Sequence, residues 1–61
     1  MSEIKKLLGK RIREVRSLRN LTQEDLSELT DIGASSISKI ESGYFHPSEK
    51  KKKKIAKALK I

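Results

Sequence analysis

Residues 21–43 read LTQEDLSELTDIGASSISKIESG and carry the clearest helix signals in the chain. Thr22 is a favourable N-cap residue, and Asp25 follows it at the position where the partner of a capping box belongs. Leu26 and the leucine just before Thr22 occupy the two positions of a hydrophobic staple. Together these signals predict a short helix over residues 23–30, with acidic residues toward the positive end of the helix dipole.

A short break, Asp31-Ile32-Gly33, separates this helix from a second one. Aspartate tolerates the left-handed backbone region and glycine is an acceptable N-cap, so the break can end one helix and begin the next. Residues 34–42 then carry two isoleucines three positions apart, and Gly43 is typical of the position just past a helix C-terminus. Two short helices joined by such a break form the arrangement of a helix-turn-helix motif.

Helices are predicted on both sides of this pair. Residues 3–19 carry apolar side chains at helical spacing, and Asn20 suits the left-handed position after that helix. Its inward residues are expected to be Ile4, Leu8, Ile12, Val15 and Leu18. Ser48 can cap a further helix over residues 49–59. From the other three helices, the expected core residues are Leu26, Leu29, Ile37, Ile40, Ile55 and Leu59.

The predicted fold class is all-α, because no stretch of alternating polar and apolar residues is long enough for a strand. The expected architecture is a compact bundle of four short helices with the helix-turn-helix at its centre. Gly9 is the expected weak point of the first helix, because glycine in a helix costs about 1 kcal/mol relative to alanine. With 61 residues, the chain is expected to form a single domain over residues 1–61.

The chain is strongly basic: 15 Lys and Arg face 8 Asp and Glu, for a formal net charge of +7. This balance favours a polyanionic partner, and nucleic acid is the first candidate. There is no cysteine and His46 is the only histidine, so neither a disulfide nor a zinc site is expected. No apolar run is longer than Leu7-Leu8, so no membrane span is expected. Because so small a core leaves little room to shape a pocket, we expect no enzymatic activity and no cofactor.

Several blocks of residues, in order along the chain, resemble the Xre/Cro family of helix-turn-helix regulators. They are LGKRIR from Leu8, LTQEDL from Leu21, SISKIESG from Ser36, Pro47-Ser48, and IAKAL from Ile55. The similarity covers residues 8–59, and the family includes phage repressors and many bacterial transcription regulators. It implies a cytoplasmic protein of bacterial or phage origin that binds double-stranded DNA, as a homodimer in the full-length protein or on DNA.

Some positions depart from the family pattern in the turn, in the second helix and in the fourth helix: Ser27, Asp31, Gly33, Glu49 and Lys52. Lys52 stands where the family places an apolar anchor, so its aliphatic stem is expected along the core with the ammonium exposed. The chain stops at Ile61, where the family continues into a fifth helix that commonly helps to form the dimer. A domain taken from a longer regulator would end in this way.

By this resemblance, residues 34–42 form the recognition helix that enters the major groove of DNA. The residues expected to face base edges are Gly33, Ala34, Ser35, Ser38 and Lys39. Lys39 is the strongest reader among them, because its ammonium can donate to guanine O6 and N7. The residues expected to contact phosphates are Arg16, Thr22, Gln23, Ser42, His46 and Lys50, and Arg16 is also expected to pair with Glu41.

Each of these assignments has a plainer alternative. From the residues alone, Ser35 and Ser38 are more typical of solvated helix positions than of base contacts, and Gln23 is an ordinary helix former. Phe45 suits either a core plug or an exposed ledge for a sugar. The five lysines over residues 50–54 suit a solvated charged face, a phosphate contact or a nuclear-localisation signal, and the last fits poorly with a mainly prokaryotic family.

These expectations favour sequence-specific double-stranded DNA binding by a transcription regulator, with repression as the favoured mode. Two other classes of function stay open at this point. A helix-turn-helix scaffold can act as a protein-interaction module, as in an antitoxin, with DNA binding secondary. A basic amphipathic peptide can also lie on a membrane surface, although the narrow apolar faces and few aromatic residues disfavour that interpretation.

Overall fold

The structure is a computed structural model that describes residues 2–61. It confirms the predicted all-α class, because the described part of the chain holds four helices and no strand. The helices are α1 (Ser2–Leu18), α2 (Gln23–Thr30), α3 (Ala34–Glu41) and α4 (Glu49–Leu59). Their bounds differ from the predicted ones by one residue at most, and α2 and α4 agree at both ends.

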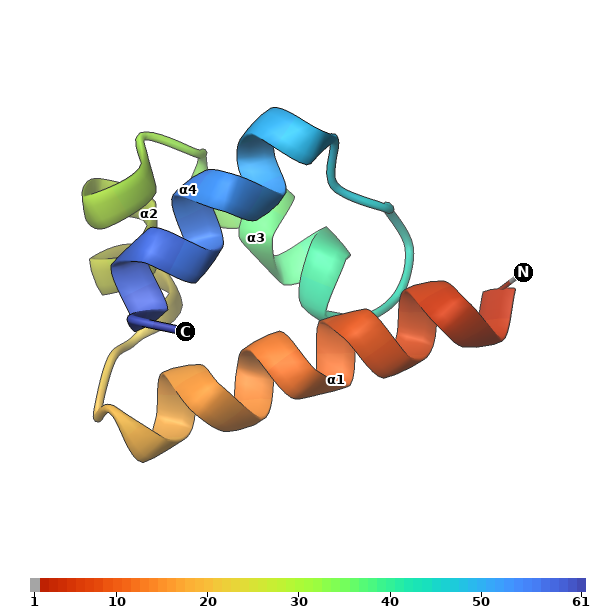
Figure 1. Ribbon diagram of the computed structural model, residues 1–61, viewed down its shortest axis with the longest axis horizontal. Helices are drawn as coiled ribbons and strands as arrows, with labels where there is room; N and C mark the ends of the chain where they lie inside the picture. Colours follow the sequence, from red (N-terminus) through yellow and green to blue (C-terminus); the bar gives the residue numbers. More distant parts are fainter. Residues whose placement is uncertain (1) are drawn as a thin grey trace.

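The longest helix, α1, runs along one side of the molecule, and the three shorter helices lie together on its other side (Figure 1). α3 packs against both α1 and α2, and α4 packs against α2 and α1. The resulting bundle measures 28 × 21 × 20 Å along its principal axes. Over residues 2–61, no helix combines the length and the apolar character that a membrane crossing requires.

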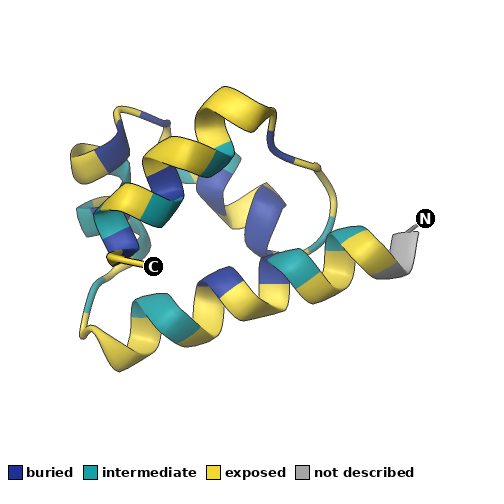
Figure 2. Cartoon of the chain, viewed as in Figure 1, coloured by how far each residue is buried: buried dark blue, intermediate teal, exposed yellow. Residues whose placement is uncertain are grey.

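All four helices contribute buried apolar residues to one core cluster. Figure 2 shows buried positions, in dark blue, distributed over the four helices and the turn between α2 and α3. The core cluster consists of Ile12, Leu26, Ile32, Ile37, Ile40, Ile55 and Leu59. Burying one such side chain stabilises a protein by about 1.5–3 kcal/mol, so this cluster is the main favourable term in folding. Five of the six core residues predicted for α2, α3 and α4 belong to it.

The sixth predicted core residue, Leu29, lies outside the core, so this prediction was wrong. Its side chain is 60% exposed, because Leu26 and Thr30 occupy the inner side of this short helix one turn apart. The buried Thr30 hydroxyl donates to the carbonyl of Leu26 at 2.7 Å and accepts from the backbone N–H of Ile32 at 3.3 Å. Ile32, which lies in the turn and which the sequence pattern did not assign to the core, is 5% exposed and belongs to the core cluster.

The apolar face predicted for α1 is wrong at both of its ends. Ile12 is buried, and Leu8 and Val15 are partly buried against the core. Ile4 and Leu18 are instead 62% and 82% exposed. These two residues lie in the first and last turns of α1, at the edge of a packed face that is centred on Ile12, and the shorter helices do not cover them.

Gly9 lies where α1 approaches the C-terminal end of α3. A Cβ atom at this position would collide with the carbonyl oxygen of Ile40 and would lie 2.6 Å from that of Glu41. Both obstacles are backbone atoms, so a side chain could be accommodated only by moving one helix away from the other. The expected weak point of the first helix is therefore the position that allows α3 to pack closely on α1.

Residues in the left-handed conformation follow all four helices: Asn20, Asp31, Gly43 and Lys60, with φ between 58° and 82°. After α1, α3 and α4, a backbone N–H returns to the carbonyl five residues earlier, as in a Schellman motif. These bonds are Leu21 to Arg16 (3.1 Å), Tyr44 to Lys39 (2.8 Å) and Ile61 to Ala56 (3.0 Å). The predicted left-handed conformations of Asn20, Asp31 and Gly43 are confirmed.

Candidate nucleic-acid interface

α3 is held by its inner side and exposes its outer side. Its inner residues Ile37, Ile40 and Glu41 are buried. The outer side presents residues that are exposed or, for Ala34, half-buried: Gly33, Ala34, Ser35, Ser38 and Lys39. We refer to these five residues as the α3 face. It brings together all the residues that the sequence predicts to meet base edges.

Lys39 is the basic residue of the α3 face. Its Nζ lies 5.3 Å from the centroid of the Phe45 ring, which is within the range of a cation–π interaction. Its carbonyl oxygen accepts hydrogen bonds from the N–H groups of Tyr44 (2.8 Å) and Phe45 (3.2 Å) and from the hydroxyl of Ser42 (3.0 Å). These bonds fasten the loop after α3 to the end of the helix and place a half-exposed aromatic ring beside the ammonium group.

A polar cluster sets the position of α3. Arg16 of α1 donates from Nε and Nη2 to the carboxylate of Glu41, at 2.6 and 3.1 Å, and from Nη1 to the carbonyl of Leu21 at 2.6 Å. Nε2 of Gln23, the first residue of α2, donates to the same carboxylate at 3.1 Å. The Glu41 side chain is 3% exposed and that of Arg16 is 13% exposed. The expected pair is therefore present, and it joins α1, α2 and α3 through one carboxylate.

The same cluster leaves some donors free. A guanidinium group carries five N–H groups, and Arg16 uses three of them here. The Gln23 amide carries two N–H groups, of which the bond to Glu41 uses one. Both side chains can therefore still donate to a phosphate while they hold α3 in place.

The start of α2 is a complete capping box. The backbone N–H of Asp25 donates to the Thr22 hydroxyl oxygen at 3.0 Å, and the backbone N–H of Thr22 donates to the Asp25 carboxylate at 2.9 Å. The bond from that N–H, followed by the contact with the Thr22 hydroxyl, holds the pKa of Asp25 below its ordinary value. The Thr22 hydroxyl is exposed and accepts within the box, so its own hydrogen stays available to a phosphate.

The remaining predicted phosphate contacts lie after α3. Ser42 is exposed, but its hydroxyl already donates to Lys39. Nδ1 of His46 lies 3.0 Å from the carbonyl oxygen of Pro47, which accepts a hydrogen bond when Nδ1 carries the hydrogen. His46 is exposed on the surface of the loop before α4. Lys50 is exposed in the first turn of α4 and is free of such constraints.

Lys52 and Glu49 form an ion pair on the same turn of α4, with 2.9 Å between Nζ and Oε1. The hydrogen bond from Lys52 and its charge hold the pKa of Glu49 below its ordinary value. The Lys52 side chain is 36% exposed, which agrees with a stem against the bundle and an ammonium group in solvent. The ion pair offsets part of the lysine repulsion at this helix start.

Arg13 is a candidate that the sequence analysis did not single out. It is exposed, and it lines one surface hollow together with Arg16, Gln23, Ser38 and Ser42. A cation from α1 thus lies beside the α3 face. The signal available in the sequence was its spacing of three from Arg16, which places both residues on neighbouring parts of one helix side.

The other end of the α3 face has a different charge. Ala34 lines a hollow together with Glu24, Asp25 and Glu28 of α2. The start of α3 therefore lies beside acidic side chains. Its last turn carries Lys39 and lies near Arg13 of α1. In the described part of the chain, no three carboxylate or imidazole groups gather closely enough to hold a metal ion.

The chain matches the sequence model of one protein family over residues 9–61, a range that includes most of α1 and all of α2, α3 and α4. That family is a family of helix-turn-helix domains. No curated protein and no solved structure shows a significant match. The matched range contains the capped α2, the three-residue turn and the exposed side of α3. The chain belongs to the helix-turn-helix domain family.

Proposed function

We propose that this protein is a sequence-specific double-stranded DNA-binding transcription regulator of the Xre/Cro type, in which α3 enters the major groove. The observation that carries the proposal is the two-sided character of α3. Ile37, Ile40 and Glu41 fix its inner side, while the α3 face is free to meet base edges. An isolated surface helix without this support would lose its orientation on binding.

Within this proposal, Lys39 reads guanine through O6 and N7, and Ser35 and Ser38 bond base edges with their hydroxyls. Ala34 packs on a thymine methyl group, and the backbone of Gly33 lies close to the bases. The acidic side chains near Ala34 favour bases that present an amino group at that end of the α3 face.

Phosphate contacts supply most of the affinity in this proposal. Arg16, Thr22 and Gln23 act at the start of α2, where unpaired backbone N–H groups also favour an anion. Arg13, Lys50 and His46 add contacts on either side, and Ser42 contributes only after its hydroxyl turns outward. The whole chain acts as one DNA-binding domain in the bacterial cytoplasm, without a metal or cofactor.

Regulation follows from occupancy of the operator, and we favour repression, in which the bound protein blocks the polymerase, over activation, in which it recruits the polymerase. Two copies would read two half-sites about 34 Å apart, as in other regulators with this motif. A single copy is expected to bind non-specific DNA only weakly, with a dissociation constant of about 10⁻⁴–10⁻⁶ M.

The experiment is a selection of bound duplexes from a random pool, followed by anisotropy titration of the selected duplex and of a scrambled duplex. Lys39→Ala should weaken binding to the selected duplex by about 5- to 150-fold, the value of one lost base contact, and should change binding to the scrambled duplex far less. Lys57→Ala, an exposed lysine of the last turn of α4, is the matched control and should leave the preference intact.

A Lys39→Ala variant with unchanged preference would remove the base-reading role from this residue. A pool from which no duplex is enriched would contradict sequence-specific binding and would favour the protein-interaction module instead.

A further inference from the structure

A row of four residues on the outer side of α1 takes no part in the bundle. Leu7, Arg11, Glu14 and Leu18 follow one another at spacings of four, three and four, which places them on one side of the helix. Leu7 is 68% exposed and Leu18 is 82% exposed. We call these four residues the α1 seam. The same spacing is found in the contact row of a two-stranded coiled coil.

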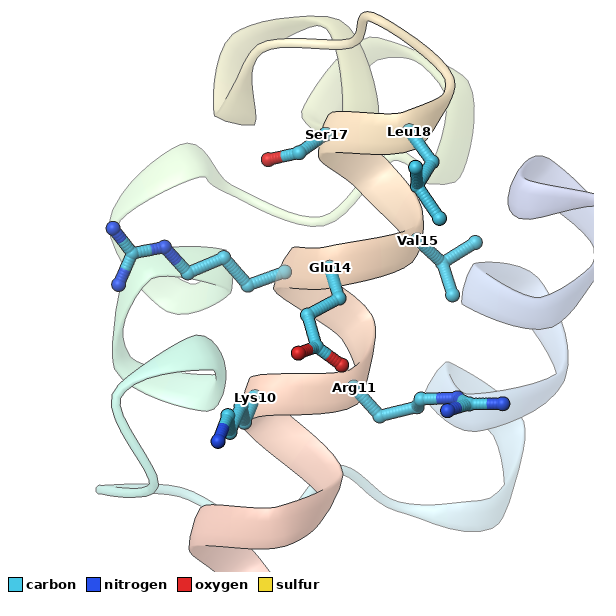
Figure 3. Close-up of a pocket in the computed structure, with 7 residues that line it drawn as sticks. Lys10, Arg11, Glu14, Val15, Ser17 and Leu18 are labelled. Atoms are coloured by element: carbon cyan, nitrogen blue, oxygen red, sulfur yellow. The ribbon is translucent and has the colours of Figure 1, made fainter.

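The two charged residues of the α1 seam lack partners within the part of the chain that the structure describes. The ion pairs found there join Arg16 to Glu41 and Lys52 to Glu49. Figure 3 shows the side chains of Arg11, Glu14 and Leu18 projecting from α1 around one open hollow, with Arg11 and Leu18 on the same flank. Two exposed leucines and two unpaired opposite charges thus share one surface.

The order of these residues is self-complementary. Leu7 and Leu18 lie at equal distances from the midpoint between Ile12 and Arg13, and so do Arg11 and Glu14. When two copies of such a helix pack antiparallel about a two-fold axis at that midpoint, each residue faces its mirror position in the partner. Leu7 then meets Leu18 of the other copy, and Arg11 meets Glu14, with each contact made twice.

We propose that the α1 seam is a homodimer interface, on which a second copy of this chain packs with its α1 antiparallel. Charge complementarity selects this occupant, because an antiparallel copy matches both charges and both leucines at once. A parallel copy would set Arg11 against Arg11 and Glu14 against Glu14. The dimer leaves the α3 face uncovered, since Gly9, where α1 meets α3, lies on the opposite side of α1 from the seam.

The dimer is expected to be weak. A contact made by one 17-residue helix from each copy is small beside the roughly 1,200–2,000 Å² that stable complexes bury. The formal charge of +7 on each copy adds repulsion. Association should therefore depend on concentration, with monomer at low concentration and dimer in the upper micromolar to millimolar range.

Sedimentation equilibrium of the whole chain, without DNA, tests the proposal through charge exchange. Arg11→Glu alone places two pairs of glutamates face to face, and Glu14→Arg alone places two pairs of arginines face to face. Each variant should dimerise about 10-fold or more weakly than the parent chain, because facing like charges oppose association. An equimolar mixture of the two variants should recover dimer, since both facing pairs then have opposite charges.

The double variant R11E/E14R should dimerise as the parent chain does, because the exchange preserves both pairs. Circular dichroism melts check folding, and both substitutions lie on exposed positions of α1. A parent chain that stays monomeric at millimolar concentration overturns the proposal, and so does a mixture that dimerises no better than either variant alone. Because no DNA is present, either result leaves the proposed DNA binding to be judged by its own experiment.

Discussion

At the scale of single residues, Gly9 reverses the usual effect of a helix glycine. Replacing an interior helix glycine by alanine normally stabilises a protein by about 1 kcal/mol. Here the added methyl group meets the carbonyl oxygens of Ile40 and Glu41. We therefore expect Gly9→Ala to lower the melting temperature by at least about 4–8 °C, the shift that 1 kcal/mol produces in so small a domain.

Thermal melts followed by circular dichroism measure this effect. Ser17→Ala is the control, because Ser17 is an exposed residue of the same helix and alanine is the better helix former. That variant should melt at or slightly above the temperature of the parent chain. A Gly9→Ala variant that melts above the parent would show that α1 and α3 do not approach as closely as described.

The ionised Asp25 side chain makes the thermal stability of the fold fall as the solution becomes acidic. Its pKa is lower in the folded chain because the backbone N–H of Thr22 donates to its carboxylate. A carboxyl group with a lowered folded pKa stabilises the fold above its unfolded pKa, and this stabilisation is lost as the pH falls through the folded pKa. Asp25→Asn should therefore lower the melting temperature at pH 7, and the difference from the parent should shrink in the acidic range below the ordinary pKa of aspartate.

Melts of both proteins from pH 7 down to pH 3 provide the measurement, and an NMR titration of Asp25 gives its pKa directly. A difference in melting temperature that stays constant over the whole range would rule out the carboxylate as the source of the effect.

Residue-scale features were predictable from the sequence where their cause is local. The capping box of Thr22 and Asp25 needs only residues three positions apart, and the left-handed Asp31 follows from its own residue type. Gly9 and the contact between Lys39 and Phe45 depend on segments that meet only after folding. The pairing of Arg16 with Glu41, 25 residues apart, was expected because the family resemblance supplied the distant contact.

At the scale of the elements, α2 offers a comparison of two leucines on one helix. Leu26 is fully buried and Leu29 is 60% exposed. Leu26→Ala should destabilise the fold by about 2–5 kcal/mol, through lost burial and the cavity left behind. Leu29→Ala should stay within about 0.5 kcal/mol of the parent, as surface substitutions usually do.

Urea titrations of both variants measure the change in the free energy of unfolding. Leu29→Ala is the control, because it makes the same leucine-to-alanine change in helix propensity without removing a buried side chain. Equal losses for the two variants would contradict the orientation of α2 in the bundle.

Helix bounds were more predictable than helix orientation. Caps and left-handed stop residues mark the ends, so α2 and α4 were located to the residue. Which residues face inward depends on how a helix is rotated against its neighbours. In α2 this rotation favours Thr30 over Leu29, because the Thr30 hydroxyl satisfies its hydrogen bonds within the chain. The core therefore includes a threonine that hydrophobicity alone would not select.

At the scale of the whole molecule, the excess of basic residues predicts that DNA binding depends strongly on salt, with a slope set by the number of phosphates contacted. If about five phosphates are contacted per copy, the logarithm of the association constant should fall with the logarithm of salt concentration at a slope of roughly −4 to −5. Lys50→Ala should make that slope shallower by about 1, because the phosphate contact proposed for Lys50 would be lost. Ser35→Ala, which removes no charge, should leave the slope unchanged.

Anisotropy titrations at several salt concentrations yield these slopes. A slope near zero for the parent chain would exclude phosphate contacts as the main source of affinity. The overall charge, and the polyanionic class of partner that it favours, were readable from composition. The division of the α3 face into an acidic start and a basic end required the packing of α2 and α1 around it.

The carboxylate of Glu41 also bears on how such a protein acquires a new target. Arg16 of α1 and Gln23, the first residue of α2, both donate to this carboxylate, so two neighbouring helices fix the orientation of α3. An eight-residue helix is about 12 Å long, so a tilt of about ten degrees would displace its far tip by about 2 Å. As long as Glu41 and its two donors are kept, Ser35 and Ser38 can be replaced by other side chains without changing the orientation of α3. If the α3 face reads DNA as proposed, its specificity can change while the packing of α3 stays the same.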